Sequence, residues 1–229
     1  PVGCDLIHVS YTHDGVRKLG SFLRAMAYQS NTWMIPKLAD FALPIQPAWR
    51  AKAQELLDLW RPTKPIMIYR PLVERKEWAG NAPRNPDPTA YVDLAKSVID
   101  GFFSVTLADL SPNEEWAVSG PIDTNVTLTN GELDLGTMAA LFSMSDLVYT
   151  APGFGLILAQ AVGTRVVSVF GGHESARFYD HGSEHEHFIQ PTNPCECFRK
   201  DHNCDKHIPF SAKQHLKAFL SDEKIKQEV

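Results

Sequence analysis

The chain has 229 residues, of which 44% are hydrophobic and 21% are charged, with 14 Gly and 16 Pro. This is the composition of a globular protein, and it excludes disordered, collagen-like and coiled-coil chains. The formal net charge is -5, from 22 Lys and Arg against 27 Asp and Glu. The chain therefore has no overall basic footprint, which disfavours a nucleic-acid partner.

The first part of the chain holds few elements. Its hydrophobic pattern predicts one strand and two helices, at 5–11, 16–29 and 48–60. Two prolines make 61–65 a stiff linker. Residues 1–60 are too few for a complete second α/β domain, and we interpret them as the remnant of an N-terminal domain whose beginning is missing. Residues 61–229 form the second predicted domain.

From about Lys64, strand-like and helix-like stretches alternate. Strands are predicted at 65–69, 102–107, 125–129, 146–150 and 165–170. Helices are predicted between them, at 87–100, 135–144 and 154–162. Strands with little polar alternation, separated by helices, are typical of a parallel sheet covered on both faces. The predicted fold class is α/β, a Rossmann-like doubly wound parallel sheet with part of a second α/β domain at the N-terminus.

One uncharged run, residues 147–164, is long enough to span a membrane, but it contains Pro152 and several glycines. A buried strand followed by a short buried helix explains it better, so we expect no transmembrane segment. The sequence shows no targeting motif, and its 4 cysteines are too few for a disulfide scaffold. A cytoplasmic location is therefore expected.

A Pro/Gly turn joins the strand at 146–150 directly to the helix at 154–162. It puts Gly153, Phe154 and Gly155 at the helix N-terminus, at the carboxyl end of a parallel strand, where open α/β sheets bind ligands. Free backbone N–H groups and the helix dipole favour an anion such as a phosphate there. The alternative is that the glycines only make a tight turn, and the pattern alone does not decide between the two.

Three stretches carry a resemblance to a known family: MAALFSMSDLVYTAPGFGLILAQAVGTRVVSVFGG at 138–172, IYRPLVERKEWAGNAPRNP at 68–86 and NPCECFRKDHNC at 193–204. They resemble the C-terminal domain of the heptosyltransferase-type glycosyltransferases (glycosyltransferase family 9), over roughly Pro65 to Cys204. The resemblance implies the C-terminal half of a GT-B fold, in which residues 61–229 are the nucleotide-sugar-binding domain and residues 1–60 the remnant of an acceptor-side domain. It also implies inverting transfer of a sugar from a nucleotide-diphosphate donor to an acceptor hydroxyl.

The chain departs from the family pattern at two places. Where the family has Asp-Ser/Thr-Gly this chain has Pro152-Gly153-Phe154, and where the family has His it has Ile157. Side-chain contacts to the donor phosphate and sugar are therefore lost, whereas the backbone amides of the turn remain. The family's base comes from early in the N-terminal domain, and no matching segment is found here. The catalytic residues are therefore left unknown.

Residues that follow the first strand are further candidates for the donor and nucleotide site. Arg70 ends the strand, and Lys76 lies in the charged loop behind it, where a cation would neutralise the leaving nucleoside diphosphate. A solvated charged loop is the alternative for Lys76. Trp78 belongs to the K-x-W stretch of the resemblance and would either stack on the ligand or pack within the loop.

Two later positions complete the candidate set. Glu114 and Glu115 come after the second strand, where the resemblance implies a carboxylate that holds the nucleotide ribose. Helix N-terminal charge is the alternative for this pair. Thr137, at the start of the next helix, is a candidate for the wall of the base pocket.

Cys195, Cys197 and Cys204 cluster near the end of the domain, with His202 and His207 close by. Thiolate and imidazole ligands suit a structural, tetrahedral zinc site, for which we take the three cysteines and His207 as ligands. The spacing differs from the usual Cys-x2-Cys pair, so free thiols or a disulfide to Cys204 remain alternatives. No cofactor is expected for catalysis itself.

The sequence thus predicts a glycosyltransferase whose partners are a nucleotide-diphosphate sugar and a saccharide or glycolipid acceptor. The alternative is a non-catalytic, degenerate glycosyltransferase-like module for nucleotide binding or assembly. The missing Asp and His favour the module, whereas Lys76, Trp78 and the glycine turn favour the enzyme. The acidic balance disfavours a third hypothesis, a transferase acting on nucleic acid.

Overall fold

The computed structural model describes residues 10–30, 42–78, 84–110, 114–199 and 202–221, without the side chain of Trp78. At its centre is a six-stranded sheet in the order β5-β3-β1-β6-β7-β8, in which every neighbouring pair is parallel. The strands are β1 (Ile66–Tyr69), β3 (Phe103–Leu107), β5 (Val126–Leu128), β6 (Leu147–Thr150), β7 (Val166–Val169) and β8 (Glu186–Ile189).

The strand order identifies the fold. Counting only these six strands along the chain, the spatial order is 3-2-1-4-5-6, which is the Rossmann order. All residues of β1, β6 and β7 are buried, because helices cover both faces of the sheet. The predicted fold class, an α/β protein with a Rossmann-like parallel sheet, is confirmed.

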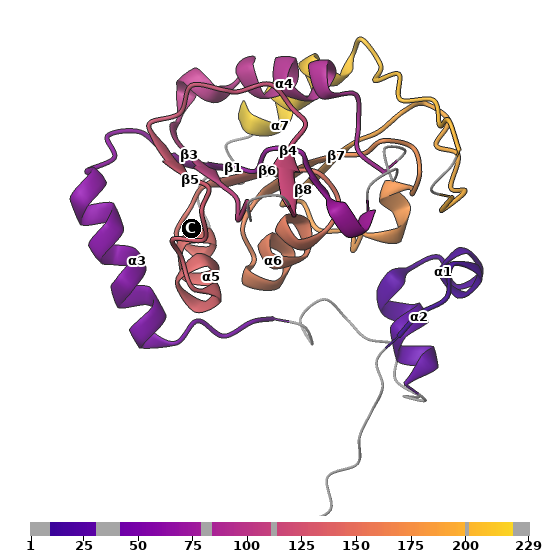
Figure 1. Cartoon of the computed structure of the whole chain (residues 1–229), viewed down its shortest axis with the longest axis horizontal. Coiled ribbons are helices and arrows are strands. Elements are labelled where there is room, and N and C mark those ends of the chain that lie inside the picture. Colours follow the sequence, from indigo (N-terminus) through magenta and orange to yellow (C-terminus); the bar gives the residue numbers. More distant parts are fainter. Residues whose placement is uncertain (1–9, 31–41, 79–83, 111–113, 200–201, 222–229) are drawn as a thin grey trace, which may run out of the picture.

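Figure 1 shows the helices in two layers on either side of the sheet. On one side lie α3 (Pro47–Trp60), α5 (Leu135–Ser143) and α6 (Phe154–Val162); on the other lie α4 (Pro88–Lys96) and α7 (Ala212–Ser221). Two hydrophobic cores result, because alternate strand residues point to opposite faces. Ile68 and Val148 belong to the first core, and Met67 and Tyr149 to the second.

The helices that precede β1 also contact this domain. Helix α3 packs on α5, where Trp49 lies so close to Gly136 that a Cβ added there would come within 2.6 Å of the indole ring. Helices α1 (His13–Leu19) and α2 (Phe22–Gln29) pack through Phe22, whose ring lies 4.8 Å from that of Tyr179 and 6.2 Å from that of Phe198.

Short elements fill the connections. An antiparallel ribbon of β2 (Val73–Arg75) and β4 (Glu115–Ala117) follows the carboxyl ends of β1 and β3. Three single-turn 3₁₀ helices complete the described elements: η2 (Lys76–Trp78), η3 (Ile99–Gly101) and η4 (Ala176–Phe178).

Several predicted elements differ in detail. The expected helix at 16–29 is divided at Gly20, which adopts a left-handed φ of 69° and ends α1. The expected helix at 87–100 ends at Lys96, after which the chain tightens into η3. Strand β8 was not predicted, because four residues within a His-rich polar stretch give no period to detect. The predicted strand at 5–11 falls mostly outside the described residues.

The uncharged run at 147–164 is divided between strand β6 and helix α6. In the part of the chain that the structure describes, no helix combines the length and the apolar character needed to cross a membrane.

Candidate functional site

The sheet has a topological switch point between its neighbouring strands β1 and β6. From β1 the chain crosses to β3 on one side, whereas from β6 it crosses to β7 on the other. Such a divergence leaves a crevice at the carboxyl ends of the two strands, where Rossmann-like sheets bind ligands. A cavity of about 290 Å³ lies at this point, lined by residues 70–75, 84–85, 109, 115 and 150–155.

The turn from β6 to α6 forms one wall of the cavity. Gly153 is the residue before the helix and has φ 133° and ψ -147°, a backbone conformation open to glycine and strained for other residues. Among the described residues no side chain caps the helix, so its first N–H groups have neither an intrahelical acceptor nor a capping one there. Together with the helix dipole, they make the turn suited to an anion.

Gly155 allows the opposite wall to approach this turn. A Cβ added at Gly155 would come within 2.5 Å of Cδ of Arg70 and 2.6 Å of Oγ1 of Thr150. The absence of a side chain at this position therefore lets the Arg70 stem lie directly against the first turn of α6. This close approach gives Gly155 a role beyond making a tight turn.

Arg70 is the central cation of the cavity. Its N–H donates to the carbonyl of Tyr149 at 2.9 Å, and its carbonyl accepts from the Tyr91 hydroxyl at 2.5 Å, so its backbone is fixed between β6 and α4. Its guanidinium lies 5.5 Å from the centre of the Phe154 ring, a cation–π contact. The Nη1 atom is buried and has no hydrogen-bond partner among the described residues.

The pKa of Arg70 is consistent with a guanidinium whose hydrogen-bond donors are not all paired within the described part of the chain. Burial lowers the pKa of its guanidinium below the ordinary value, and the positive charge of Arg75 adds to that effect, whereas Tyr91 and Glu115 oppose it. A buried guanidinium with an unused N–H gains from an anionic partner, since a charged hydrogen bond would satisfy the donor and offset the loss of hydration.

Arg84 is a second cation at the cavity, and the sequence did not single it out. Its Nε donates to Oε1 of Glu174 at 3.0 Å, and the hydroxyl of Tyr179 donates to the other Glu174 oxygen at 3.0 Å. Burial opposes the charge on Arg84, but the Glu174 carboxylate outweighs it and raises the pKa of the guanidinium. Nη2 of Arg84 lies 3.6 Å from the position of a Cβ on Gly153, beside the uncapped turn.

The short ribbon separates the two predicted glutamates. Glu115 lies in β4, lines the cavity and forms an ion pair with Arg75 of β2. Glu114 lies outside the cavity and pairs with Lys76 at 3.4 Å, with both side chains mostly exposed. Antiparallel pairing also links these two residues by a backbone hydrogen bond of 2.7 Å. Glu115 therefore joins the cavity, whereas Lys76 and Glu114 do not.

The remaining candidates lie elsewhere. Thr137 is buried at the start of α5, where its N–H and hydroxyl donate to the Asp134 carboxylate at 2.8 and 3.0 Å. It serves the helix end and does not line the cavity. The backbone of Trp78 lies in η2, and its side chain is outside the described part of the structure.

The cysteine cluster forms, but with a different histidine. Cys195, Cys197 and Cys204 converge with His202, and their ligand atoms all lie within 4.8 Å of one another. His207, which the sequence interpretation took as the fourth ligand, is exposed and lies outside this group. The turn that follows Cys204 accounts for this placement, because the N–H of His207 donates to the Asp205 side chain at 2.9 Å.

The cavity thus brings together Arg70, Glu115, Gly153, Phe154 and Gly155 from the predicted set. It adds Arg84, Asn85 and Asp109, which were not predicted. Arg84 stood within the stretch 68–86 that carried the resemblance, but a Pro-rich loop has no period that could place its side chain. Asp109, two residues beyond β3, could have been found from the rule that polar residues after parallel strands meet at one edge.

Comparison with known proteins supports the fold. Neither the protein-family models nor the curated proteins give a match to the sequence. The structure is similar to a family 9 glycosyltransferase from Veillonella parvula DSM 2008, with a TM-score of 0.57, 14% identity, and coverage of 91% of this chain and 61% of that one. It is also similar to the E. coli ADP-heptose LPS heptosyltransferase II, with a TM-score of 0.56 and 17% identity.

The heptosyltransferase match covers 89% of this chain and 62% of the other, so the chain spans about three fifths of either structure. Its Rossmann-like sheet corresponds to half of a GT-B fold. The likeness in fold to family 9, heptosyltransferase-like glycosyltransferases is therefore confirmed.

Proposed function

We propose that this chain forms the donor-binding part of a glycosyltransferase, which moves a sugar from a nucleotide-diphosphate donor to an acceptor hydroxyl with inversion. One observation carries the proposal. At the switch point of a glycosyltransferase-like fold, Arg70 lines a cavity beside an uncapped helix N-terminus, and its buried Nη1 has no hydrogen-bond partner among the described residues. A diphosphate supplies the negative charge and the acceptor oxygens that this combination lacks.

The chemistry required of the site is stabilisation of the leaving group. Breaking the sugar–phosphate bond concentrates negative charge on the nucleoside diphosphate, and fixed donors aimed at that charge lower the barrier. Backbone N–H groups at 153–155 and the guanidinium of Arg70 would contact the phosphates, and Arg84 would add a second positive charge. Arg84 is positioned for this by Glu174, which is itself buried.

The carboxylates of the cavity suit the other parts of the donor. Asp109 and Glu115 can accept hydrogen bonds from vicinal hydroxyls of a ribose or a sugar. We expect the acceptor to be a saccharide or a glycolipid, as in the sequence interpretation. No catalytic base is assigned, because the cavity defines the donor side and not the position of the acceptor hydroxyl.

Calorimetric titration of the full chain with ADP, UDP, GDP and CDP tests the proposal. At least one of them is expected to saturate. Arg70→Met, which keeps the aliphatic stem against Gly155 and Phe154, is expected to weaken binding by about 10–100-fold, the worth of one hydrogen bond to a charged group. Lys76→Ala is the matched control, since Lys76 is a neighbouring exposed cation outside the cavity, and it is expected to change affinity less than about threefold.

Two results would contradict this assignment. If no nucleoside diphosphate binds at millimolar concentration, the donor-site proposal fails as a whole. If Lys76→Ala loses binding while Arg70→Met retains it, the diphosphate lies outside the cavity, nearer to η2.

A non-catalytic nucleotide-binding module is the second candidate. It is favoured by Phe154 and Ile157, two apolar side chains on the first turn of α6 that are 49% and 46% exposed. In the family pattern, this turn carries residues that contact the donor. A module would bind the nucleoside diphosphate but neither hydrolyse a nucleotide sugar nor transfer its sugar to saccharide or glycolipid acceptors. Measuring binding and turnover on one preparation distinguishes the two functions.

A further inference from the structure

The loop between β8 and α7 gathers four soft ligands at one point. Sγ of Cys197 lies 3.5 Å from Sγ of Cys204, Sγ of Cys195 lies 3.5 Å from Nδ1 of His202, and the same nitrogen lies 3.4 Å from Sγ of Cys204. All four ligand atoms fall within 4.8 Å of one another. The four groups therefore surround a common centre.

These separations fit a tetrahedral metal ion. With Zn–S bonds of about 2.3 Å and Zn–N bonds of about 2.0 Å, neighbouring ligand atoms around a tetrahedron lie about 3.5–3.8 Å apart. The three short separations of 3.4–3.5 Å lie at or just below the lower end of this range, and the longest separation requires only a small movement of the loop. A disulfide between Cys197 and Cys204 would need the two sulfurs to approach to about 2.05 Å.

The backbone around Cys197 is shaped to present its sulfur. Glu196 and Phe198, on either side of it, have left-handed φ angles of 52° and 53°, which non-glycine residues rarely adopt. Beyond this double turn, the N–H of Arg199 donates to Sγ of Cys197 at 3.5 Å. Cys195 is fixed by its own N–H, which donates to the carbonyl of Gly172 at 2.8 Å. Hydrogen bonds of this kind orient metal ligands.

We propose that Cys195, Cys197, His202 and Cys204 bind one structural Zn²⁺ ion, which holds the loop in the shape that docks helices α1 and α2. Three thiolates and one imidazole are a ligand set that zinc prefers, and four protein ligands leave no open position for catalysis. The site is independent of the donor cavity and goes beyond the proposed transferase function.

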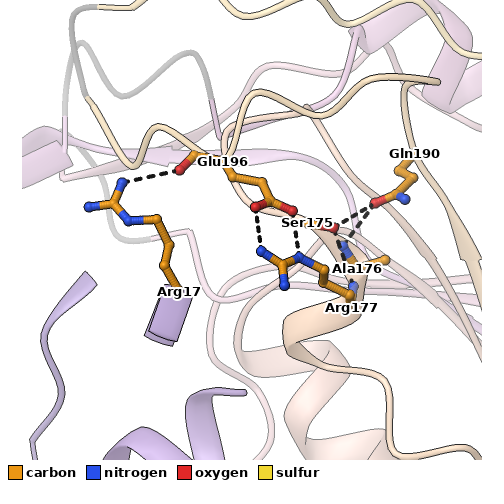
Figure 2. Close-up of polar contacts among 6 residues, drawn as sticks. All are labelled: Arg17, Ser175, Ala176, Arg177, Gln190 and Glu196. Atoms are coloured by element: carbon orange, nitrogen blue, oxygen red, sulfur yellow. Dashed lines mark hydrogen bonds and ion pairs between the residues drawn. The ribbon is translucent and has the colours of Figure 1, made fainter. Parts of the chain in front are cut away.

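The docking role follows from the residues between the ligands. In Figure 2, the Glu196 carboxylate bridges to Arg177 through two hydrogen bonds of 2.7 and 2.6 Å, while its backbone carbonyl faces Arg17 of α1 at 3.5 Å. The ring of Phe198 stacks on that of His13 of α1, with centroids 4.7 Å apart. The loop therefore contacts α1 through two residues whose backbone positions the metal ligands fix.

Figure 2 also shows how the loop is tied to the sheet domain. Ser175 and the N–H of Ala176 both contact Oε1 of Gln190, just after β8, at 3.4 and 2.9 Å. Arg177, which binds Glu196, belongs to the same turn. The ion would thus connect α1, the 195–204 loop and η4 into one unit.

Elemental analysis of the untagged full chain tests the metal. About one equivalent of zinc is expected, because structural sites of this type bind tightly. His202→Ala and Cys204→Ser are expected to lose it. His207→Ala and Cys4→Ser, matched controls that change a neighbouring histidine and the chain's other cysteine, are expected to retain it.

Replacing zinc with Co²⁺ keeps the test valid if those variants fail to fold. The wild-type chain loaded with Co²⁺ is expected to give the intense visible bands of a tetrahedral ion and thiolate-to-metal charge transfer. His202→Cys, which supplies a fourth thiolate, is expected to retain the metal with a shifted spectrum. A metal-free preparation that binds neither ion, or that has a Cys197–Cys204 disulfide by mass spectrometry, overturns the proposal.

Hydrogen exchange tests the docking role. Removing the ion with a chelator is expected to increase exchange in α1 and α2 by about tenfold or more, the behaviour of a locally opened unit. Exchange in α3, which packs on α5 away from the loop, is expected to stay unchanged, as is binding of nucleoside diphosphate. Loss of the ion without faster exchange in α1 and α2 would leave the metal site but refute its docking role.

Discussion

Helices α4, α5 and α6 all cover the same sheet, but their N-termini are capped differently. Helix α4 begins after Asp87, whose carboxylate accepts from the N–H of Ala90 at 2.8 Å, and α5 begins after Asp134, which accepts from Thr137 at the same distance. Helix α6 begins after Gly153 and has no side-chain cap in the part of the chain that the structure describes. In α4 and α5 the preceding aspartate accepts a hydrogen bond from an N–H of the first turn. In α6 the first N–H groups instead face a cavity lined by arginines.

The difference shows how one structural unit serves either stability or binding. An aspartate before a helix neutralises the positive end of the dipole and occupies the N–H groups, so an anion gains nothing by approaching. Without that carboxylate, the same helix end is left with unsatisfied donors. At α6 they are accompanied by two guanidiniums, Arg70 and Arg84.

The largest expected effect concerns the carboxylate that holds Arg84 beside the uncapped turn. Glu174→Gln removes the charge partner of a largely enclosed guanidinium, and we expect the free energy of unfolding to fall by about 2–3 kcal/mol. This is less than for a fully buried pair, because the Arg84 side chain is 33% exposed. Glu114→Gln, which breaks the exposed pair with Lys76, is expected to cost less than about 1 kcal/mol. Equal losses in urea denaturation would show that Glu174 does not serve to position Arg84.

The next largest effect on stability is expected from a side chain added at the uncapped N-terminus of α6. Gly155→Ala drives a methyl group into the Arg70 stem and Thr150, and we expect a loss of about 1–3 kcal/mol in stability from overpacking. Nucleoside diphosphate binding should fall with it, because Arg70 is displaced. Gly163→Ala, at the other end of α6, is strained by its φ of 75° but meets no atom within 4 Å. Gly163→Ala should therefore lose stability but bind the nucleoside diphosphate as wild type does. Equal affinity of Gly155→Ala and Gly163→Ala would mean that the ligand binds outside this cavity.

A carboxylate placed before α6 would make its N-terminus resemble that of α5, which follows Asp134. We expect Pro152→Asp to weaken binding of a plain nucleoside diphosphate by about 1 kcal/mol, the repulsion of two charges near the surface at high effective dielectric. Pro152→Asn is the uncharged control and also restores the backbone N–H. Titration at two salt concentrations should show the difference between the variants shrinking with ionic strength. Tighter binding in the aspartate variant would mean that the anion lies elsewhere.

The contribution of the capped N-terminus of α5 to stability should depend on acid pH, and that of the uncapped N-terminus of α6 should not. The N–H of Thr137, followed by Lys52, lowers the pKa of Asp134 to about 2, from an ordinary value of 3.8. The contribution of this carboxylate to stability is therefore present above about pH 4 and is lost as the pH falls towards 2. Thermal unfolding of Asp134→Asn across this range should show a shallower decline than wild type, and Pro152→Asn should not. If the thermal stability of wild type and of Asp134→Asn declines in parallel, the Asp134 cap does not contribute to the acid sensitivity of the protein.

Much of the fold could be predicted because the sheet is buried on both faces. Strands such as 66–69 and 147–150 are buried along their whole length and show little polar alternation, and their spacing with helices indicates parallel pairing. The turn at 153–155 and Arg70 could be found for the same reason, since they adjoin strand ends. Strand β8 was missed because a four-residue strand with polar flanks lacks that signal.

The rest of the site depends on contacts between distant loops. Lys76 was expected in the cavity, but the pairing of β2 with β4 turns it towards Glu114, and three-residue strands leave no sequence period. Arg84 contacts Glu174, 90 positions away, from a Pro-rich stretch whose sequence has no period. His202 joins the cysteines in place of His207 because the chain turns after Cys204, where the N–H of His207 donates to the Asp205 side chain, and sequence spacing does not reveal such a turn.

The position of β1 between β3 and β6 also bears on how the molecule folds. The N–H of Arg70, just after β1, donates to the carbonyl of Tyr149 in β6, about 80 positions further along the chain, so the two walls of the cavity meet only after a long loop has closed. Parallel sheets with such distant pairings fold slowly, since the entropy of loop closure is lost before the contacts form. The cavity therefore forms only where β1 and β6 are paired. A ligand held there stabilises, by mass action, every form in which these two strands are paired and no form in which they are apart.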